Sequence, residues 1–128
     1  MVGLTIRPMS IPVDLVRLRE EVTRFGPSCY LLTVTDDGRP HAVAVSVVWA
    51  DDALRVSAGR TTRANAARRP SVSLLWPPVD DEGFSLIVDG LASVNESEAE
   101  VTVQPDKAVL HRARAEGAGS DCVTLLPA

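Results

Sequence analysis

Cysteine, long hydrophobic runs and signal-like segments are scarce or missing in this sequence of 128 residues. The two cysteines, Cys29 and Cys122, lie far apart without metal-type spacing, which argues against a disulfide framework and against a zinc site. The longest apolar run, residues 42–50, is interrupted by Ser46 and is far shorter than the roughly 20 residues that cross a bilayer. The N-terminus lacks the charged and apolar segments of a secretory signal. We therefore expect a soluble, cytoplasmic protein without a membrane partner.

Aromatic residues are also few, at 4% of the chain, so the core is expected to consist of Val, Ala, Leu and Ile, and the heavy use of Val favours β structure. Neither sign of charge dominates, and the net charge of −4 argues against a nucleic-acid partner. At this length we expect one domain spanning residues 1–128. The segment between Asp52 and Asp80 nevertheless contains no acidic residue but five arginines: Arg55, Arg60, Arg63, Arg68 and Arg69.

Two segments are predicted to be helical. Apolar residues recur with helical spacing over residues 13–25, and Gly26-Pro27 ends that helix. Residues 61–69 are rich in Ala and Arg, with Thr61 at the start as a hydroxyl cap and Pro70 as a stop.

Extended segments separated by turn signals fill most of the remaining chain. The first two are joined around Asp37-Gly38, a pair that supplies the positive φ of a tight hairpin. Another contains Asp89-Gly90, which we interpret as a bulge rather than a hairpin turn. The predicted strands are residues 29–35, 41–50, 54–58, 71–76, 84–94, 100–104 and 107–112, with a short strand at residues 122–125.

The C-terminal part leaves one alternative open. Residues 100–104 and 107–112 hinge at Pro105-Asp106 if both are extended, but residues 107–116 also have the propensity for a helix that Gly117 would end. Six or more strands with hairpin connections and one inserted helix predict a small antiparallel β-barrel.

Signatures of several enzyme classes are missing. The chain has no Gly-rich dinucleotide or P-loop motif, no G-x-S-x-G motif and no H-E-x-x-H motif. His41 and His111 do not indicate a metal site on spacing alone, and both are interpreted as surface or interface residues. We predict no metal, and catalytic residues stay unassigned, although Cys29, His41 and Asp121 carry suitable groups.

Part of the arginine-rich segment has the features of a phosphate site. The sequence runs from a predicted strand through Gly59 into a predicted helix, which gathers free backbone N–H groups and the positive end of a helix dipole. Arg60 and Arg63 can bind phosphate oxygens, and Thr61 or Thr62 can donate from its hydroxyl. Solvated arginines are the alternative. The last two arginines of the helix are expected to complement its C-terminus.

The strand at residues 41–50 carries a second feature. Bulky residues alternate there with smaller ones, so that one face presents Ala42, Ala44, Ser46 and Val48. A face of small residues lets a flat ring lie close to the backbone. Close packing against a helix or a neighbouring subunit is the alternative interpretation.

Five sequence blocks occur in order along the chain: residues 37–49 (DGRPHAVAVSVVW), 54–59 (LRVSAG), 60–63 (RTTR), 69–76 (RPSVSLLW) and 88–92 (VDGLA). Together they resemble the pyridoxamine 5′-phosphate oxidase-like, flavin-binding split-barrel family over roughly residues 27–104. The resemblance implies a mainly β fold, a six-stranded antiparallel split β-barrel with one N-terminal helix and a short helix after the third strand. It also implies a homodimer that binds FMN, or the deazaflavin F420, between its subunits.

The resemblance further implies a cofactor site built from two strands and the helix that follows them. The first strand faces the flavin ring and ribityl chain, and the helix start holds the phosphate. Ala64 stands where many members have a second basic residue, and the family's longer substrate-binding C-terminal segment has no clear counterpart. The implied cofactor-binding residues are Ala42, Val43, Ala44, Val45, Ser46, Ser57, Ala58, Arg60, Thr62 and Arg63.

Two functional hypotheses follow. The first is a flavin- or F420-dependent oxidoreductase that acts on an unidentified small-molecule substrate, in which the cofactor carries the hydride chemistry. The second is a non-catalytic split-barrel protein that binds a cofactor or haem, motivated by Ala64 and by the lack of an evident substrate residue. Either protein is expected to be a homodimer, with Trp49 and Trp76 as interface anchors.

Overall fold

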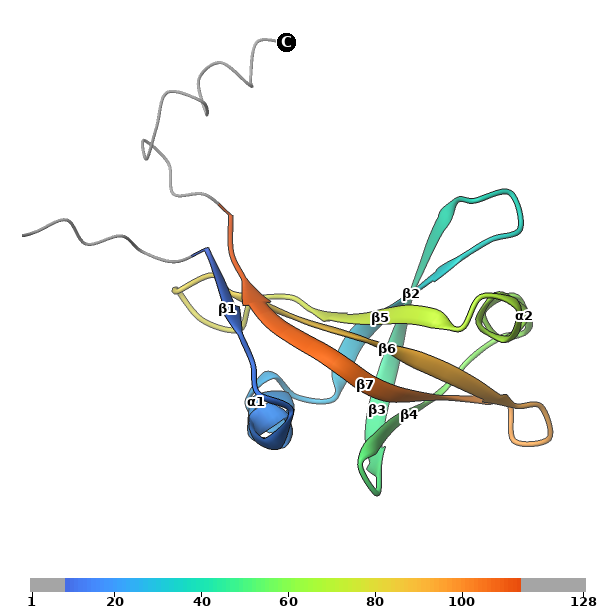
Figure 1. The fold of residues 1–128 in the computed structure, drawn as a ribbon, viewed down its shortest axis with the longest axis horizontal. Coiled ribbons are helices and arrows are strands. Elements are labelled where there is room, and N and C mark those ends of the chain that lie inside the picture. Colours follow the sequence, from blue (N-terminus) through green and yellow to red (C-terminus); the bar gives the residue numbers. More distant parts are fainter. Residues whose placement is uncertain (1–8, 114–128) are drawn as a thin grey trace, which may run out of the picture.

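Six antiparallel strands close into a barrel in the computed structural model, which describes residues 9–113 (Figure 1). The barrel strands are β2 (Ser28–Val34), β3 (Pro40–Ala50), β4 (Ala53–Ser57), β5 (Ser71–Trp76), β6 (Ser85–Asn95) and β7 (Glu100–His111). Around the barrel their order is β7, β4, β3, β2, β5 and β6, and β6 pairs again with β7 to close the ring. Alternate residues of every strand therefore point into one enclosed core. The predicted six-stranded antiparallel barrel is confirmed.

A short strand at the N-terminal end is an addition to the predicted elements. This strand, β1 (Ser10–Pro12), pairs with the far end of β7, where Ser10 lies opposite His111. The Val13 N–H then donates to the Ala108 carbonyl (2.9 Å). Three residues carry too little alternation to be recognised as a strand from the sequence, and their partner lies at the other end of the described chain.

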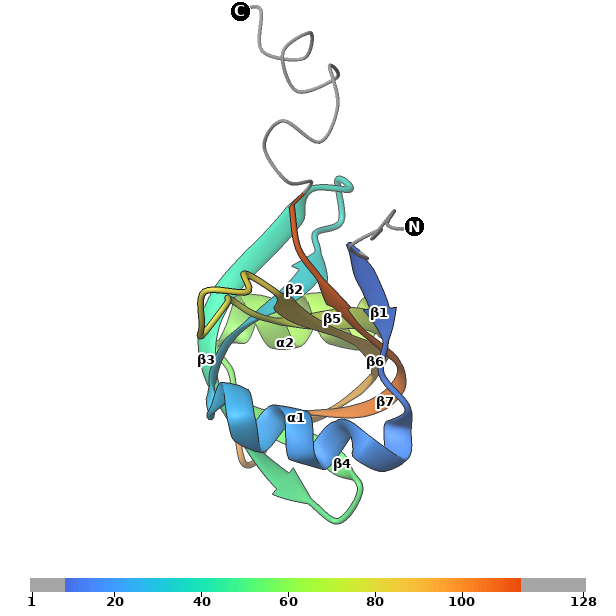
Figure 2. The ribbon, with the colours of Figure 1, turned by 90° about the vertical axis from the view of Figure 1, so that its left-hand side faces the viewer.

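The N-terminal helix begins later than predicted. A 3₁₀ turn, η1 (Leu15–Arg17), leads into α1 (Leu18–Phe25), and the Asp14 carboxylate caps this start by accepting from the Val16 N–H (3.1 Å). Figures 1 and 2 show α1 and the second helix, α2 (Arg60–Arg68), at opposite ends of the barrel. No helix of the described residues is long and apolar enough to cross a membrane. The buried face of α1 consists of Leu18, Val22 and Phe25.

The strand β6 runs without a break through Asp89-Gly90, and the predicted bulge is present with its extra residue on the partner strand. Asp89 pairs with Lys107 and Gly90 pairs with Pro105, so Asp106 of β7 has no partner in β6. The two extended segments expected on either side of Pro105-Asp106 are therefore one strand, and residues 107–111 are not helical. The short strand predicted at residues 122–125 lies outside the described residues.

The barrel core is mainly aliphatic, as the low aromatic content predicts. Leu31, Leu54, Leu74 and Leu86 have no exposed surface. Trp76 is fully buried among them, and its Nε1–H donates to the Gly26 carbonyl (2.8 Å). The prediction that Trp76 anchors a subunit interface is therefore wrong, because the alternation of β5 turns this side chain inward.

Candidate functional site

The helix α2 begins without a capping side chain. Gly59 occupies the N-cap with extended backbone. Because glycine has no side chain, it offers no hydrogen-bond acceptor to the backbone N–H groups of the first turn. The predicted threonine cap is wrong, because Thr61 and Thr62 both lie inside the helix. Backbone N–H groups of the first turn therefore remain available to an anion, at the positive end of the helix dipole.

A cavity of about 290 Å³ lies beside this helix start, between β3, the end of β4 and the first turn of α2. The predicted cofactor residues that line it are Val43, Ala44, Val45, Ser57, Ala58, Arg60 and Thr62. The lining also includes His41, Gly59 and Thr61. Residues from three consecutive elements thus meet around one space, as the strand–glycine–helix pattern predicts.

A second cavity, of about 460 Å³, adjoins the first along β3. The two share Ala44, Val45 and Ser57, so together they form one elongated groove. Ser46 lines the second cavity, together with Tyr30 of β2. Among the predicted cofactor residues, Ala42 and Arg63 line neither cavity. Ala42 lies exposed on the outer side of β3.

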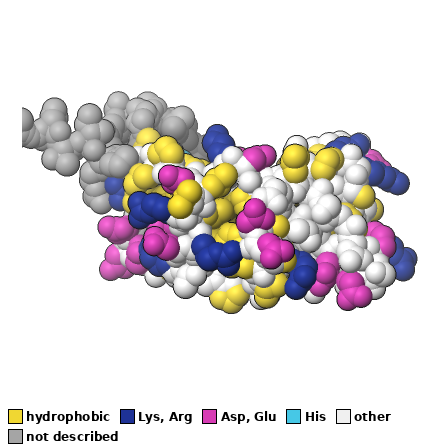
Figure 3. Space-filling model, turned by 60° about the horizontal axis from the view of Figure 1, so that its bottom comes forward, with side chains coloured by type: hydrophobic (Ala, Val, Ile, Leu, Met, Phe, Trp, Pro, Cys, Tyr) yellow, Lys and Arg dark blue, Asp and Glu magenta, His cyan; other side chains and the backbone are white. Residues whose placement is uncertain are grey.

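Ion pairs neutralise most of the arginine-rich segment. Arg55 pairs with Glu100 (Nε to Oε2, 3.7 Å), and Arg63 pairs with Glu96 (Nε to Oε1, 3.2 Å). Within residues 9–113, Arg60 is exposed and pairs with no carboxylate, so it is the arginine of this segment that is free to bind an anion. Basic and acidic side chains are also interspersed on the face of the molecule that Figure 3 shows.

The two arginines at the end of α2 lie away from the groove. Arg68 and Arg69 both bind the carboxylate of Asp36 in the β2–β3 turn, Arg69 through Nη1 at 2.8 Å. The hydrogen bond from Arg69, with further help from Arg68, lowers the pKa of Asp36 from its ordinary value of 3.8. These arginines therefore connect the helix end to a neighbouring turn.

Buried polar contacts fix α2 against the barrel. Asn65 Nδ2 donates to Thr33 Oγ1 (3.1 Å), and both side chains are buried. Thr62 Oγ1 lies 3.4 Å from His41 Nε2, at the edge of hydrogen-bonding distance. His41, interpreted from the sequence as a surface or interface residue, is thus partly buried and faces the groove. Sequence spacing does not reveal this, because His41 and Thr62 come from different elements.

Known proteins resemble this chain in sequence and in fold. No family model matches the sequence. Two uncharacterized proteins, Mb0449c of Mycobacterium bovis and MT0457 of Mycobacterium tuberculosis, are each 39% identical to it, in an alignment of 133 positions that covers 87% of this chain and 93% of each relative.

Three solved structures share the fold at low sequence identity. A FAD binding protein from Mycobacterium smegmatis has a TM-score of 0.60 and 20% identity, over 82% of this chain and 99% of that one. A candidate pyridoxamine 5′-phosphate oxidase from Listeria innocua has a TM-score of 0.59 and 16% identity, over 73% and 97%. A heme binding protein from Mycobacterium smegmatis has a TM-score of 0.57 and 13% identity, over 81% and 54%. This chain therefore belongs to one family with its two mycobacterial relatives, and it has the split-barrel fold of these three solved structures.

One candidate catalytic group of this split barrel is held in an inert form. Cys29 lines the second cavity, but burial raises the pKa of its thiol to about 12. The nucleophilic thiolate is therefore scarce at neutral pH, which argues against a role for Cys29 in covalent chemistry. Asp121, the other acidic candidate, lies outside the described residues.

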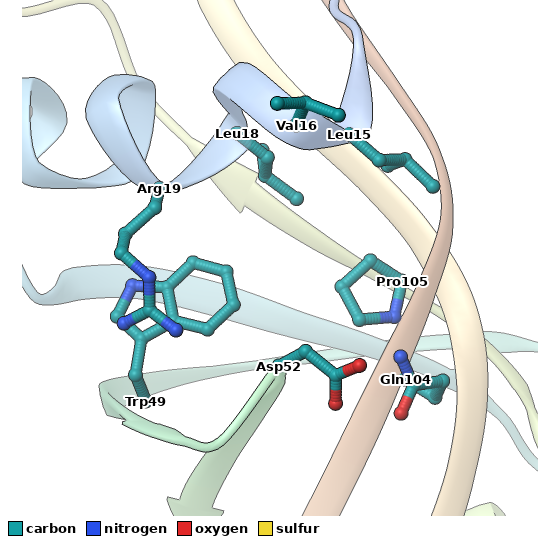
Figure 4. Close-up of a pocket in the computed structure, with 8 residues that line it drawn as sticks. All are labelled: Leu15, Val16, Leu18, Arg19, Trp49, Asp52, Gln104 and Pro105. Atoms are coloured by element: carbon teal, nitrogen blue, oxygen red, sulfur yellow. The ribbon is translucent and has the colours of Figure 1, made fainter.

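The split barrel has a further cavity, of about 310 Å³, at its α1 end (Figure 4). Arg19 stacks over the Trp49 ring there, 4.2 Å from the centroid, and donates to the Asp51 carbonyl (2.6 Å). Trp49, expected to anchor an interface, is thus partly covered by its own chain. The sequence does not predict this cavity. Its lining consists of Leu15, Val16, Leu18, Arg19, Trp49, Asp52, Gln104 and Pro105.

Proposed function

We propose that this protein binds a phosphate-bearing flavin-type cofactor, FMN or the deazaflavin F420, and acts as an oxidoreductase on a small molecule. The observation that carries the proposal is the uncapped start of α2, which faces the same cavity as Ala44, a small residue of β3. An anion site and a surface for a flat ring thus adjoin each other, as a flavin with its terminal phosphate requires.

The groove fits such a cofactor in charge and in size. Arg60 and the free N–H groups of the first helical turn would hold the phosphate, with a hydroxyl of Thr61 or Thr62 as a further donor. The isoalloxazine ring would lie along Ala44 and neighbouring residues of β3. The two adjoining cavities, of about 290 and 460 Å³, lie at the lower end of the roughly 300–1,000 Å³ that is typical of small-molecule sites.

The cofactor would supply the hydride chemistry, and the protein would bind it, orient it and exclude water from its ring. None of the groove residues is assigned a proton-transfer role. One structural relative is a FAD binding protein, which supports a flavin. Ala64 provides no second basic side chain for the phosphate. We keep a cytoplasmic location as part of the proposal because the sequence has few cysteines.

A non-catalytic cofactor- or haem-binding protein is the second candidate. His41 favours it, because a partly buried imidazole that lines the groove is a possible haem ligand. One structural relative is named as heme binding. A bound flavin that neither nicotinamide cofactors nor reduced F420 can reduce would favour this candidate over the oxidoreductase.

The proposal includes a homodimer. Four apolar residues lie in register across the outer side of β3, β2, β5 and β6: Ala44, Tyr30, Leu75 and Ile87. Tyr30 is 43% exposed and lines the second cavity. A second copy on this surface would cover an apolar patch and complete one wall of the groove.

The test combines absorbance, titration and two matched variants. Wild-type protein is expected to show or take up flavin or deazaflavin absorbance. Arg60→Ala should weaken FMN binding about tenfold or more, in line with a charge-assisted contact of roughly 1.5–3 kcal/mol. Arg68→Ala removes the same charge from the same helix but lies away from the groove, so it should leave the affinity unchanged. The proposal fails if wild-type protein binds neither cofactor.

A further inference from the structure

We infer that Glu96 competes with the phosphate of the cofactor for Arg63, so that this carboxylate sets the affinity for phosphate-bearing ligands. The inference rests on the proposed function. Arg63 belongs to the first turn of α2, and its N–H donates to the Gly59 carbonyl (3.0 Å). Its guanidinium group, however, is bound to Glu96 through Nε (3.2 Å) and to the Ala58 carbonyl through Nη1.

The two partners of this ion pair differ in their freedom to move. The Arg63 side chain is only 14% exposed, whereas that of Glu96 is 69% exposed. Arg63 is thus held against the backbone that lines the groove, and Glu96 reaches it from the solvent side. A carboxylate with this much exposure exchanges its partner for water more readily than a buried one does, but its departure still costs the energy of the ion pair.

The turn that carries Glu96 is anchored beside the groove. The Ala58 N–H donates to the Ala99 carbonyl (3.0 Å), which joins the β6–β7 turn to the end of β4. Within the turn, Asn95 Oδ1 accepts from the Glu98 N–H (3.2 Å). Glu96 is therefore kept close to Arg63 by the backbone around it, whether or not its carboxylate makes the ion pair.

The charges explain why this pair matters for a phosphate. Arg60 is unpaired within the described residues, and Ala64 supplies no cation. Arg63 lines neither cavity, but its bond to the Ala58 carbonyl holds it next to the groove, so it is the second positive group of the helix start. With Glu96 in contact, the net charge of the Arg63–Glu96 pair is about zero. A phosphate dianion must then displace the carboxylate or bind against its field, and either event weakens binding.

The experiment compares two charge-removing variants with two ligands. Glu96→Gln should tighten FMN binding about three- to tenfold at low salt, and less at high salt, because an exposed carboxylate is screened. Riboflavin has the same ring but no phosphate, so its affinity should not change. Glu98→Gln removes the same charge from the same turn, but within the described residues Glu98 pairs with no cation, and its FMN affinity should equal that of the wild type.

Titrations followed by flavin fluorescence distinguish the outcomes. Tighter FMN binding in Glu96→Gln alone supports the competition. Unchanged or weaker FMN binding, an equal gain in Glu98→Gln, or an equal gain for riboflavin overturns it while leaving the proposed function intact. Failure of both wild type and Glu96→Gln to bind FMN, riboflavin or F420 overturns the inference and the proposed function together, whereas binding of F420 alone overturns only the inference.

Discussion

Gly90 stands where β6 and β7 approach too closely for any side chain. A Cβ atom built on Gly90 would lie 2.4 Å from the Gln104 carbonyl oxygen and 2.8 Å from Val103 Cγ1. The carbonyl belongs to the backbone just before the bulge, so it cannot rotate away as a side-chain end could. The glycine in the predicted bulge is therefore required by packing and not by a positive φ.

Gly90→Ala is accordingly expected to lower the free energy of unfolding by at least about 2 kcal/mol, the scale of overpacking in a tight core. Urea unfolding followed by circular dichroism measures this loss. Ser93→Ala on the same strand is the control, because Ser93 is exposed and its replacement should change stability by less than about 0.5 kcal/mol. Equal stability of Gly90→Ala and wild type would mean that the strands separate easily at this point.

Individual site residues could be placed from the sequence only where neighbours along the chain decide the outcome. Gly59, Arg60 and Thr62 line the same cavity because they belong to one strand–helix junction. The pairing of Arg63 with Glu96 spans 33 residues and depends on the closure of the barrel, which no local pattern contains. For the same reason the sequence did not reveal that His41 faces α2.

At the level of elements, the C-terminal end of α2 is held by the carboxylate of Asp36 in the β2–β3 turn. Asp36 accepts from Arg68 and Arg69, and these bonds lower its pKa, the Arg69 hydrogen bond being the largest cause. A carboxyl group with a folded-state pKa below its unfolded value stabilises the protein fully above the unfolded pKa. That contribution is lost as the pH falls through the lower, folded-state value.

Asp36→Asn is therefore expected to melt below the wild type at pH 7, and the difference between their melting temperatures should shrink once the pH falls below 3.8. Thermal melts from pH 7 to pH 2.5 measure this convergence. Asp81→Asn is the control, because Asp81 is exposed and unpaired within residues 9–113. A difference that persists unchanged at pH 2.5 would mean that Asp36 acts through packing rather than through its charge.

The same level shows how far the sequence predicts the fold. Turns with a local chemical cause were recognised, such as the one at Asp37-Gly38, where Gly38 adopts a φ of 84°. The Asp89-Gly90 signal predicted an irregularity correctly, but the extra residue is Asp106 on β7. Which of two paired strands carries a bulge depends on register, and register is set by contacts between segments far apart in the chain.

The arrangement of charge across the whole molecule favours a small anionic ligand over a long polyanion. Most of the arginine-rich segment is neutralised by carboxylates from other parts of the fold, namely Asp36, Glu96 and Glu100. In the described chain, Arg60 is left as the unpaired cation of that segment, in a protein with a net charge of −4. One free arginine at a helix start matches a single phosphate, whereas nucleic acid binding needs an extended basic surface.

The outer side of the barrel predicts how two copies assemble. Tyr30→Arg would place a charge in the middle of the apolar row of Ala44, Tyr30, Leu75 and Ile87, and burying two such charges across a twofold interface is costly. Sedimentation at micromolar concentration should show a wild-type dimer and a Tyr30→Arg monomer. Val16→Arg is the matched control, since Val16 is 87% exposed on η1 and its replacement should leave the dimer intact.

FMN affinity should fall with the dimer in Tyr30→Arg, because Tyr30 lines the second cavity. A wild-type monomer that binds FMN with full affinity would contradict the proposed role of the partner subunit in completing the groove.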